Sequence, residues 1–244
     1  MGGSIEGILE SIRAELRESI DLEAKASSER FFKEEVKMYG MKHTISQKIG
    51  KKYLAEVKAA KLSKAEIFKL CDALWASGYQ EETYIACQFS ESQKKFYTAD
   101  DFELFFSWIA KNVSNWAMCD TLCNHTVGDL LMLYPQLAEH LLEWTGSDNR
   151  WVRRAAAVSL IIPARQGLFL SLIFEIAEAL LADPDDLVQK GYGWMLKAAS
   201  EASASNQQAV FEFVLERKAQ MPRTALRYAI EKMPADLKKA AMAR

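Results

Sequence analysis

Hydrophobic residues recur at helical spacing along almost the whole chain. One face of the first predicted helix carries Ile5, Ile8, Leu9, Ile12 and Leu16, which is the i, i+3, i+4, i+7 pattern of an amphipathic helix. The same spacing returns in residues 102–109 and 169–181. No segment shows the alternation of apolar and polar positions that β-branched strands produce. The pattern therefore predicts an all-α protein.

Proline and glycine divide this pattern into short helices joined by short loops. The five prolines fall between helical runs, where a missing N–H costs little. We expect helices over 5–24, 28–38, 44–61, 63–76, 80–94, 99–111, 115–133, 135–145, 150–162, 167–182, 185–201, 206–219, 223–232 and 235–243.

Successive helix pairs recur about every 35–40 residues from residue 63 onward, which is the period of HEAT-type repeats. Each pair buries one face against its neighbours, and stacking curves the array so that it has a concave surface. We therefore predict a HEAT-like α-α superhelix that forms a single domain over 1–244. Residues 1–4 are interpreted as a disordered start or an expression scar.

The composition is that of an ordinary globular protein, with 50% hydrophobic and 26% charged residues. Neither a secretory signal nor a membrane span is visible, so we expect a cytoplasmic location. All of the cysteines lie inside apolar helical patterns, which favours free buried thiols over a disulfide framework. They are Cys71, Cys87, Cys119 and Cys123.

Positive charge is concentrated although the net charge is −2. The segment from Arg30 to Lys61 carries nine basic residues and three acidic ones. A local basic surface attracts phosphate even on a slightly acidic molecule. The overall balance, however, is less basic than that of many dedicated nucleic-acid binders.

Trp116 and Asp120 form the first candidate constellation. They are four residues apart, so a helix places both on one face. A carboxylate beside an exposed indole is a poor core pair, which favours a site. From these two residues alone, a core tryptophan with an incidental surface carboxylate is the more common arrangement.

A second candidate is the segment Ser147-Asp148-Asn149-Arg150-Trp151-Val152-Arg153-Arg154. Its start is typical of a loop and a helix N-cap. Three arginines near a helix N-terminus are unfavourable for the helix dipole, so another group must compensate them. That group is either a phosphate or an acidic residue of a neighbouring helix, and the sequence leaves both alternatives open.

A third candidate is a cationic and aromatic helix face made by Lys190, Trp194 and Lys197. Gly191 and Gly193 interrupt the same helical pattern at a cost of about 1 kcal/mol each relative to alanine. They indicate close approach of a ligand or of another backbone. Tight helix packing explains them equally well.

Other chemistry finds little support in the sequence. Cys119, Cys123 and His125 do not have the spacing of a zinc site, and no nucleotide-binding glycine motif is present. The histidines form no recognisable triad with a nucleophile. We expect neither a metal nor an organic cofactor.

Together the three constellations resemble the AlkD family of DNA alkylation repair glycosylases, which are HEAT-like solenoids. The resemblance runs over about residues 28–233. It matches the family's Trp-x-x-x-Asp pair to Trp116 and Asp120, Ser-Asp-Asn-x-Trp-x-x-Arg to 147–154, and Gln-Lys-x-x-Gly-Trp to 189–194. It also matches an aromatic-x-Lys before a glycine turn to Phe31, Lys33 and Gly40, and Arg-x-Ala-Ile to 227–230.

The resemblance implies hydrolysis of the N-glycosidic bond of cationic N3- or N7-alkylated purines in duplex DNA. Asp120 would stabilise an oxocarbenium-like sugar and position water, while Trp116 and Trp194 would contact the cationic nucleotide. The residues implied in DNA binding are Arg154, Arg153, Lys190, Lys33, Phe31 and Arg227. The protein would act as a monomer and would not bind a membrane. It would be associated with the nucleoid when it is bound to DNA.

Two alternatives remain open at this stage: a non-catalytic binder of DNA structure on the same scaffold, and a HEAT-type scaffold that binds a protein. The sequence departs from the family pattern at Phe31, where tyrosine is common, and at Glu231, where a basic residue is usual.

Overall fold

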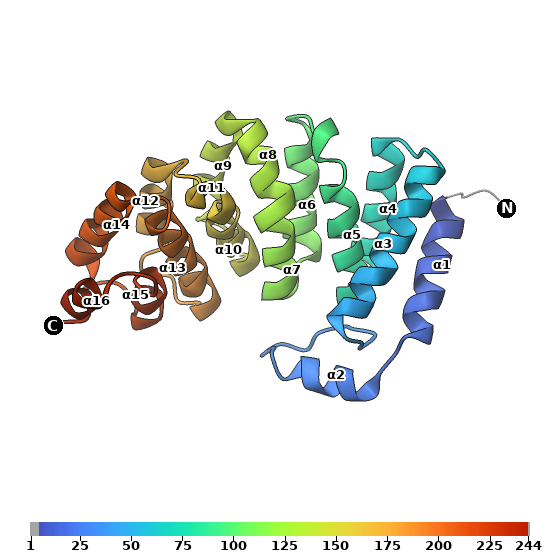
Figure 1. Cartoon of the computed structure of the whole chain (residues 1–244), viewed down its shortest axis with the longest axis horizontal. Coiled ribbons are helices and arrows are strands. Elements are labelled where there is room, and N and C mark those ends of the chain that lie inside the picture. Colours follow the sequence, from blue (N-terminus) through green and yellow to red (C-terminus); the bar gives the residue numbers. More distant parts are fainter. Residues whose placement is uncertain (1–4, 244) are drawn as a thin grey trace. The chain divides into compact units, whose positions relative to one another are not determined.

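The computed structural model describes residues 5–243, and this part of the chain is helical without a β-strand (Figure 1). The chain divides into two compact units, Met1–Leu122 and Cys123–Arg244, here called unit 1 and unit 2. The expectation for residues 1–4 lies outside the described residues. The prediction of one domain over the whole chain stays a prediction.

Unit 1 is a stack of helices whose apolar faces meet. Its α-helices are α1 (Ile5–Glu18), α2 (Leu22–Glu29), α3 (His43–Ala59), α4 (Lys64–Ala76), α5 (Gln80–Glu91), α6 (Asp101–Asn112) and α7 (Trp116–Thr121), with the 3-10 turn η1 (Lys94–Phe96) before α6. Helix α4 packs against α1, α5 and α6, and α3 packs against α1 and α5. In Figure 1, α2 lies crosswise to its neighbours in this unit.

Unit 2 is built around α13 (Asp186–Ser200), which contacts five other helices of the unit. Those helices are α10 (Arg150–Val158), α11 (Ile161–Arg165), α12 (Leu170–Ala179), α14 (Ala204–Arg217) and α15 (Arg223–Ala229). The remaining elements are the π-helical turn η2 (Leu122–Val127), which follows α7 directly, α8 (Gly128–Leu133), η3 (Pro135–Glu139), α9 (His140–Trp144) and α16 (Ala235–Met242).

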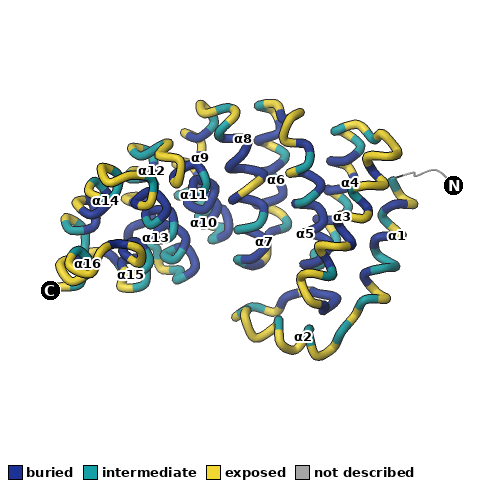
Figure 2. The backbone as a smooth tube through the Cα atoms, in the orientation of Figure 1, coloured by how far each residue is buried: buried dark blue, intermediate teal, exposed yellow. Residues whose placement is uncertain are grey.

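Burial follows the hydrophobic pattern of the sequence in both units (Figure 2). The core of unit 1 includes the fully buried Trp75 and Trp108, and that of unit 2 includes Tyr192. All four cysteines are free and buried, as predicted. Among the described residues, no helix combines the length and the apolar character needed to cross a membrane.

The predicted helices 5–24 and 28–38 are wrong. Helix α1 ends at Glu18, and α2 starts at Leu22 because the Asp21 side chain accepts hydrogen bonds from the backbone N–H groups of Glu23 and Ala24. Residues 30–42 are irregular, and within them Gly40 has a φ of +90°. A left-handed backbone of this kind favours glycine and interrupts a helix.

The predicted helix 167–182 is shorter in the structure. Both Gly167 and Phe169 have positive φ, at +78° and +61°. Helix α12 therefore begins only at Leu170 and ends at Ala179.

Candidate functional site

Trp116 forms one wall of a small pocket in unit 1. The pocket has a volume of about 180 Å³. The ring of Trp116 stacks on that of Phe32 with the centroids 5.5 Å apart. The indole N–H of Trp116 donates to the carbonyl oxygen of Phe31 at 3.4 Å. Trp116 is half-buried, so part of its surface stays open to a ligand. The other lining residues come from 28–46, α5 and the start of α7.

A chain of hydrogen bonds fixes the start of α7 against α5. Asn115 caps α7 by accepting from the backbone N–H of Met118, and its amide donates to Gln80 at 3.3 Å. Gln80 in turn donates to the Tyr84 hydroxyl at 2.7 Å. Asn115 is fully buried. The orientation of Trp116 is therefore set by α5.

Asp120 lies one helical turn beyond Trp116 on α7 and is half-buried. Its negative charge reaches Tyr84, which lines the pocket. Burial raises the pKa of Tyr84 to about 12, and the charge of Asp120 contributes to this rise. The structure thus places a carboxylate near a pocket with aromatic walls. His43 also lines the pocket, and burial lowers its pKa.

Two buried glutamates of α5 hold the irregular segment 37–42 that borders this pocket. Glu81 accepts from the backbone N–H groups of Tyr39 and Gly40 at 3.0 and 2.8 Å. Glu82 accepts from the Tyr39 hydroxyl at 2.7 Å and forms an ion pair of 3.1 Å with Arg13 of α1. Both carboxylates are buried, so these bonds form away from competing water.

Phe31 and Lys33 lie earlier in the irregular residues 30–42 and are exposed. Phe31 is 73% exposed and contributes its backbone carbonyl to Trp116. The neighbouring Phe32, which the sequence did not single out, supplies the ring that stacks on Trp116.

A second cleft of unit 1 gathers positive charge. It has a volume of about 620 Å³ and is lined by Arg13, Arg17, Lys25 and Lys37, with Glu82 as the one acidic residue among its lining side chains. Arg13 pairs with Glu82, and Lys37 donates to the carbonyl of Ser77. Arg17 and Lys25 have no side-chain hydrogen bond or ion pair with the described part of the chain. Met38 lines both this cleft and the Trp116 pocket.

In unit 2, acidic residues compensate two of the three arginines at the start of α10. Arg150 pairs with Asp185 at 3.0 Å, and Arg153 pairs with Asp183 at 2.7 Å. Asn149 caps the helix by accepting from the N–H of Trp151, as the sequence predicted. Acids near the start of α13 thus offset the unfavourable position of these arginines. The prediction that Arg153 contacts DNA is not tested by these contacts.

Arg154 belongs to α10, and its side chain packs against α13, which leaves the residue 5% exposed. Its guanidinium donates to the backbone carbonyl of Leu187. A Cβ atom at Gly191 would lie 3.4 Å from the Cγ atom of Arg154, which is an ordinary contact distance, so the backbone of α13 passes next to this side chain. The segments 147–154 and 189–194 are therefore in direct contact.

Trp194 is half-buried on α13, and the cations of its helix face are paired with acids. Lys190 pairs with Asp186 at 3.0 Å, and Lys197 pairs with Glu231 at 2.9 Å. Glu231 thus neutralises a lysine of this face. Arg227 is exposed on α15.

Gly193 packs against another helix. A Cβ atom there would lie 2.7 Å from the carbonyl oxygen of Ala225 and 2.7 Å from Cβ of Tyr228. Helix packing between α13 and α15 is thus the explanation for this glycine.

A family model that covers most of the chain decides the family. A model of the DNA alkylation repair enzyme family matches residues 12–233. The chain belongs to this family. A role in DNA alkylation repair follows, with DNA as the partner that the family indicates.

A solved structure described as a predicted DNA alkylation repair enzyme from Enterococcus faecalis has a similar fold. The TM-score is 0.77 at 17% sequence identity, over 89% of this chain and 98% of that chain. This match supports the HEAT-like all-α fold predicted from the sequence. A search of curated proteins finds no significant match.

Several side chains around the pocket of this alkylation repair protein had no recognisable signal in the sequence. Phe32, Gln80, Tyr84 and Asn115 come together only because α5, α7 and residues 30–42 pack on one another. Among the described residues, no group of three or more His, Cys, Asp or Glu side chains is arranged to hold a metal ion.

Proposed function

We propose that this protein is a DNA glycosylase that releases N3- or N7-alkylated purines from duplex DNA. The observation that carries the proposal is the position of the half-buried Asp120 one helical turn beyond Trp116 on α7, where its charge helps to raise the pKa of the pocket residue Tyr84. The chain belongs to the DNA alkylation repair enzyme family, which supports a role for this carboxylate in alkylation repair.

The proposed chemistry needs no acid to activate the leaving base. Alkylation makes the purine cationic, so the base leaves as a neutral molecule when the bond from C1′ to the base nitrogen breaks with both electrons. Water then forms a bond to C1′ and gives its proton to the Asp120 carboxylate. The products are a free base and an abasic site.

Asp120 would act in two ways. Its negative charge stabilises the oxocarbenium-like sugar as positive charge develops, and its oxygen accepts the proton of water. The ring of Trp116 offers a negative face to the cationic nucleotide. Trp194 and Arg154 of unit 2, with Arg153, Lys190, Lys33, Phe31 and Arg227, stay proposed contacts to the nucleotide and the DNA backbone.

The test is release of 7-methylguanine from methylated duplex DNA by the wild type and by Asp120→Asn. We expect release by the wild type and a loss of at least about 100-fold in the variant, which is the usual contribution of a general base. Asp100→Asn, an exposed aspartate outside the pocket, is the matched control and should retain full activity. Equal release by wild type and Asp120→Asn would refute the role of Asp120.

A second candidate is a non-catalytic DNA binder. It is favoured by the basic cleft of unit 1, which would attract phosphate whether or not Asp120 is catalytic, whereas ion pairs occupy Arg150, Arg153, Lys190 and Lys197 of unit 2. Absence of base release together with salt-sensitive DNA binding would support this candidate. In either case we expect a monomer that acts in the cytoplasm on the nucleoid.

A further inference from the structure

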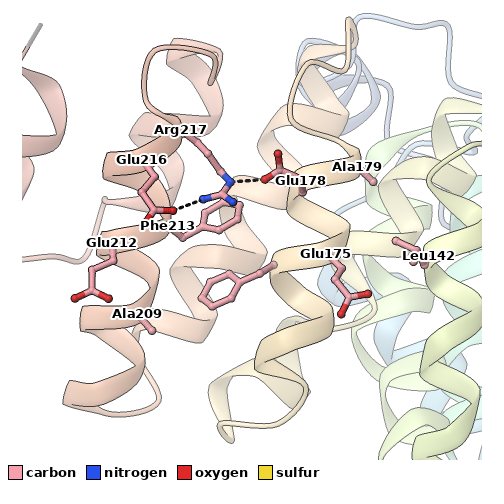
Figure 3. Close-up of a pocket in the computed structure, with 10 residues that line it drawn as sticks. Leu142, Glu175, Glu178, Ala179, Ala209, Glu212, Phe213, Glu216 and Arg217 are labelled. Atoms are coloured by element: carbon pink, nitrogen blue, oxygen red, sulfur yellow. Dashed lines mark hydrogen bonds and ion pairs between the residues drawn. The ribbon is translucent and has the colours of Figure 1, made fainter.

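A groove on unit 2 has the features of a binding surface for a positively charged protein segment. It lies between α12 and α14, has a volume of about 720 Å³, and has an apolar floor (Figure 3). Phe174 and Phe213 stack there with their centroids 4.9 Å apart and their planes 8° from parallel. Ala179, Ala209 and Leu142 extend the apolar surface.

Four glutamates and a single arginine complete the lining of this groove: Glu175, Glu178, Glu212, Glu216 and Arg217. This excess of negative charge disfavours DNA and anionic membranes, and it favours a cationic partner. The groove is therefore separate in its chemistry from the proposed DNA site.

Arg217 shows how the groove holds a cation. Its guanidinium lies 4.2 Å from the centre of the Phe213 ring and pairs with Glu178 of α12 and, at 2.8 Å, with Glu216 of α14. These contacts raise the pKa of Arg217. One cation is thus held over one ring by a carboxylate from each side of the groove.

Two further glutamates lie one helical turn along the groove, and no cation of the described chain pairs with them. Glu212 precedes Glu216 by four residues, and Glu175 precedes Glu178 by three, so each lies one turn along its own helix. Figure 3 shows Glu212 on α14 and Glu175 on α12, with their carboxylates directed away from each other. Glu212 accepts from the amide of Gln208, and no described residue pairs with Glu175.

We infer that this groove docks an arginine-bearing segment of a partner protein. An arginine of the partner would lie over the Phe174 ring, as Arg217 lies over Phe213, and the negative charges of Glu212 and Glu175 would attract it. Apolar residues next to that arginine would pack on Ala179, Ala209 and Leu142. This inference does not depend on glycosylase activity.

The test uses three labelled peptides and fluorescence anisotropy: alternating arginine and leucine, alternating citrulline and leucine, and alternating arginine and glycine. Citrulline keeps the shape of arginine but lacks its charge. We expect the arginine–leucine peptide to bind at least about fivefold more tightly than the other two, since cation–π contact and ion pairs each contribute.

The double variant Glu175→Gln/Glu212→Gln should bind the arginine–leucine peptide about five- to tenfold more weakly than the wild type. Glu56→Gln/Glu103→Gln removes the same charge from exposed positions outside the groove and should bind like the wild type. Protection from hydrogen exchange on adding the peptide should be confined to α12 and α14. Unchanged thermal melting of both variants and unchanged 7-methylguanine release would separate this result from misfolding and from the proposed function.

Equal binding by the wild type and Glu175→Gln/Glu212→Gln would overturn the inference, as would equal binding of the citrulline peptide. An equal loss in Glu56→Gln/Glu103→Gln would show that overall charge, not the groove, attracts the peptide. Self-association of the wild type that the groove variant abolishes would identify a second copy as the occupant and also overturn it.

Discussion

At the scale of single residues, Gly191 and Gly193 belong to one short helical stretch but meet different neighbours. Gly191 faces the side chain of Arg154, which a Cβ atom would meet at ordinary contact distance. Gly193 faces the backbone of α15, which cannot move aside without shifting the helix. Replacing each glycine with alanine therefore separates the cost of overpacking, which we expect only at Gly193, from the gain in helix propensity, which we expect at both positions.

We expect Gly193→Ala to lower the free energy of unfolding by up to about 2 kcal/mol. Overpacking costs about 1–3 kcal/mol, and the gain of about 1 kcal/mol in helix propensity offsets part of it. Gly191→Ala should leave stability unchanged or raise it by up to about 1 kcal/mol. Urea denaturation of both variants measures this, and equal effects would contradict the assigned contacts.

Tyr84 makes the free energy of unfolding depend on pH in the alkaline range. Its pKa is about 12 in the folded protein against 10.0 for an unperturbed tyrosine, chiefly because it is buried. The unfolded chain therefore releases this proton first as the pH rises, and the stabilisation is fully present below pH 10 and lost between pH 10 and 12.

Tyr84→Phe removes this contribution. Relative to its difference from the wild type at neutral pH, the variant should gain roughly 2–3 kcal/mol of unfolding free energy by pH 12. Denaturation at a series of pH values measures the change. A constant difference between the two proteins across this range would show that Tyr84 titrates normally.

At the scale of elements, the irregular segment 37–42 depends on α5. Glu81 accepts from two backbone N–H groups of this segment, which belongs to no helix or sheet. Glu81→Gln replaces one accepting oxygen with an NH₂ group that faces a donor. We expect the free energy of unfolding to fall by about 1–3 kcal/mol, the cost of leaving a buried donor without a partner.

Hydrogen exchange locates the effect of Glu81→Gln. The amides of Tyr39 and Gly40 should exchange faster in the variant, whereas Glu56→Gln on the exposed side of α3 should leave them unchanged. Unchanged exchange at both amides in Glu81→Gln would contradict this role of the carboxylate.

This segment also shows why part of the fold could not be predicted. The helices follow from a periodicity that each carries locally, so most of them are placed correctly. Residues 28–38 contain apolar positions that suggest another helix, but the carbonyl of Phe31 accepts from Trp116, and the N–H groups of Tyr39 and Gly40 that follow donate to Glu81, far along the sequence. Nothing within 28–38 indicates those partners.

The same distinction applies to the site. Trp116 and Asp120 share one helix, so their common face could be predicted from spacing. Phe32 and Tyr84 join them through packing between separate elements, and neither has a local signal. Similarly, the sequence showed that the arginines of 150–154 need partners, but only the fold identifies Asp183 and Asp185 for two of them.

At the scale of the whole molecule, a net charge of −2 coexists with a basic cleft on unit 1 and an acidic groove on unit 2. DNA affinity should therefore depend on a few local cations rather than on total charge. Arg17 and Lys25 are suited to this role because they face the basic cleft without an acidic partner among the described residues.

We expect Arg17→Gln/Lys25→Gln to weaken binding to duplex DNA and to flatten its salt dependence. The slope of the logarithm of the binding constant against the logarithm of salt concentration should shrink by about 1–2, the value for losing one or two phosphate contacts. Fluorescence anisotropy at several salt concentrations measures the slope. Lys58→Gln/Lys69→Gln, exposed lysines outside the cleft, should keep the wild-type slope, and equal slopes for all three proteins would exclude the cleft from DNA binding.

Because all four cysteines are buried, the folded protein should react only slowly with thiol reagents. The thiolate is the reactive form, and burial raises the pKa of the Cys71 thiol well above its usual range. A maleimide dye should therefore react with the folded chain only as fast as the helices open. One cysteine introduced at an exposed position, such as Glu103→Cys, would accept a fluorophore selectively without removal of any native cysteine.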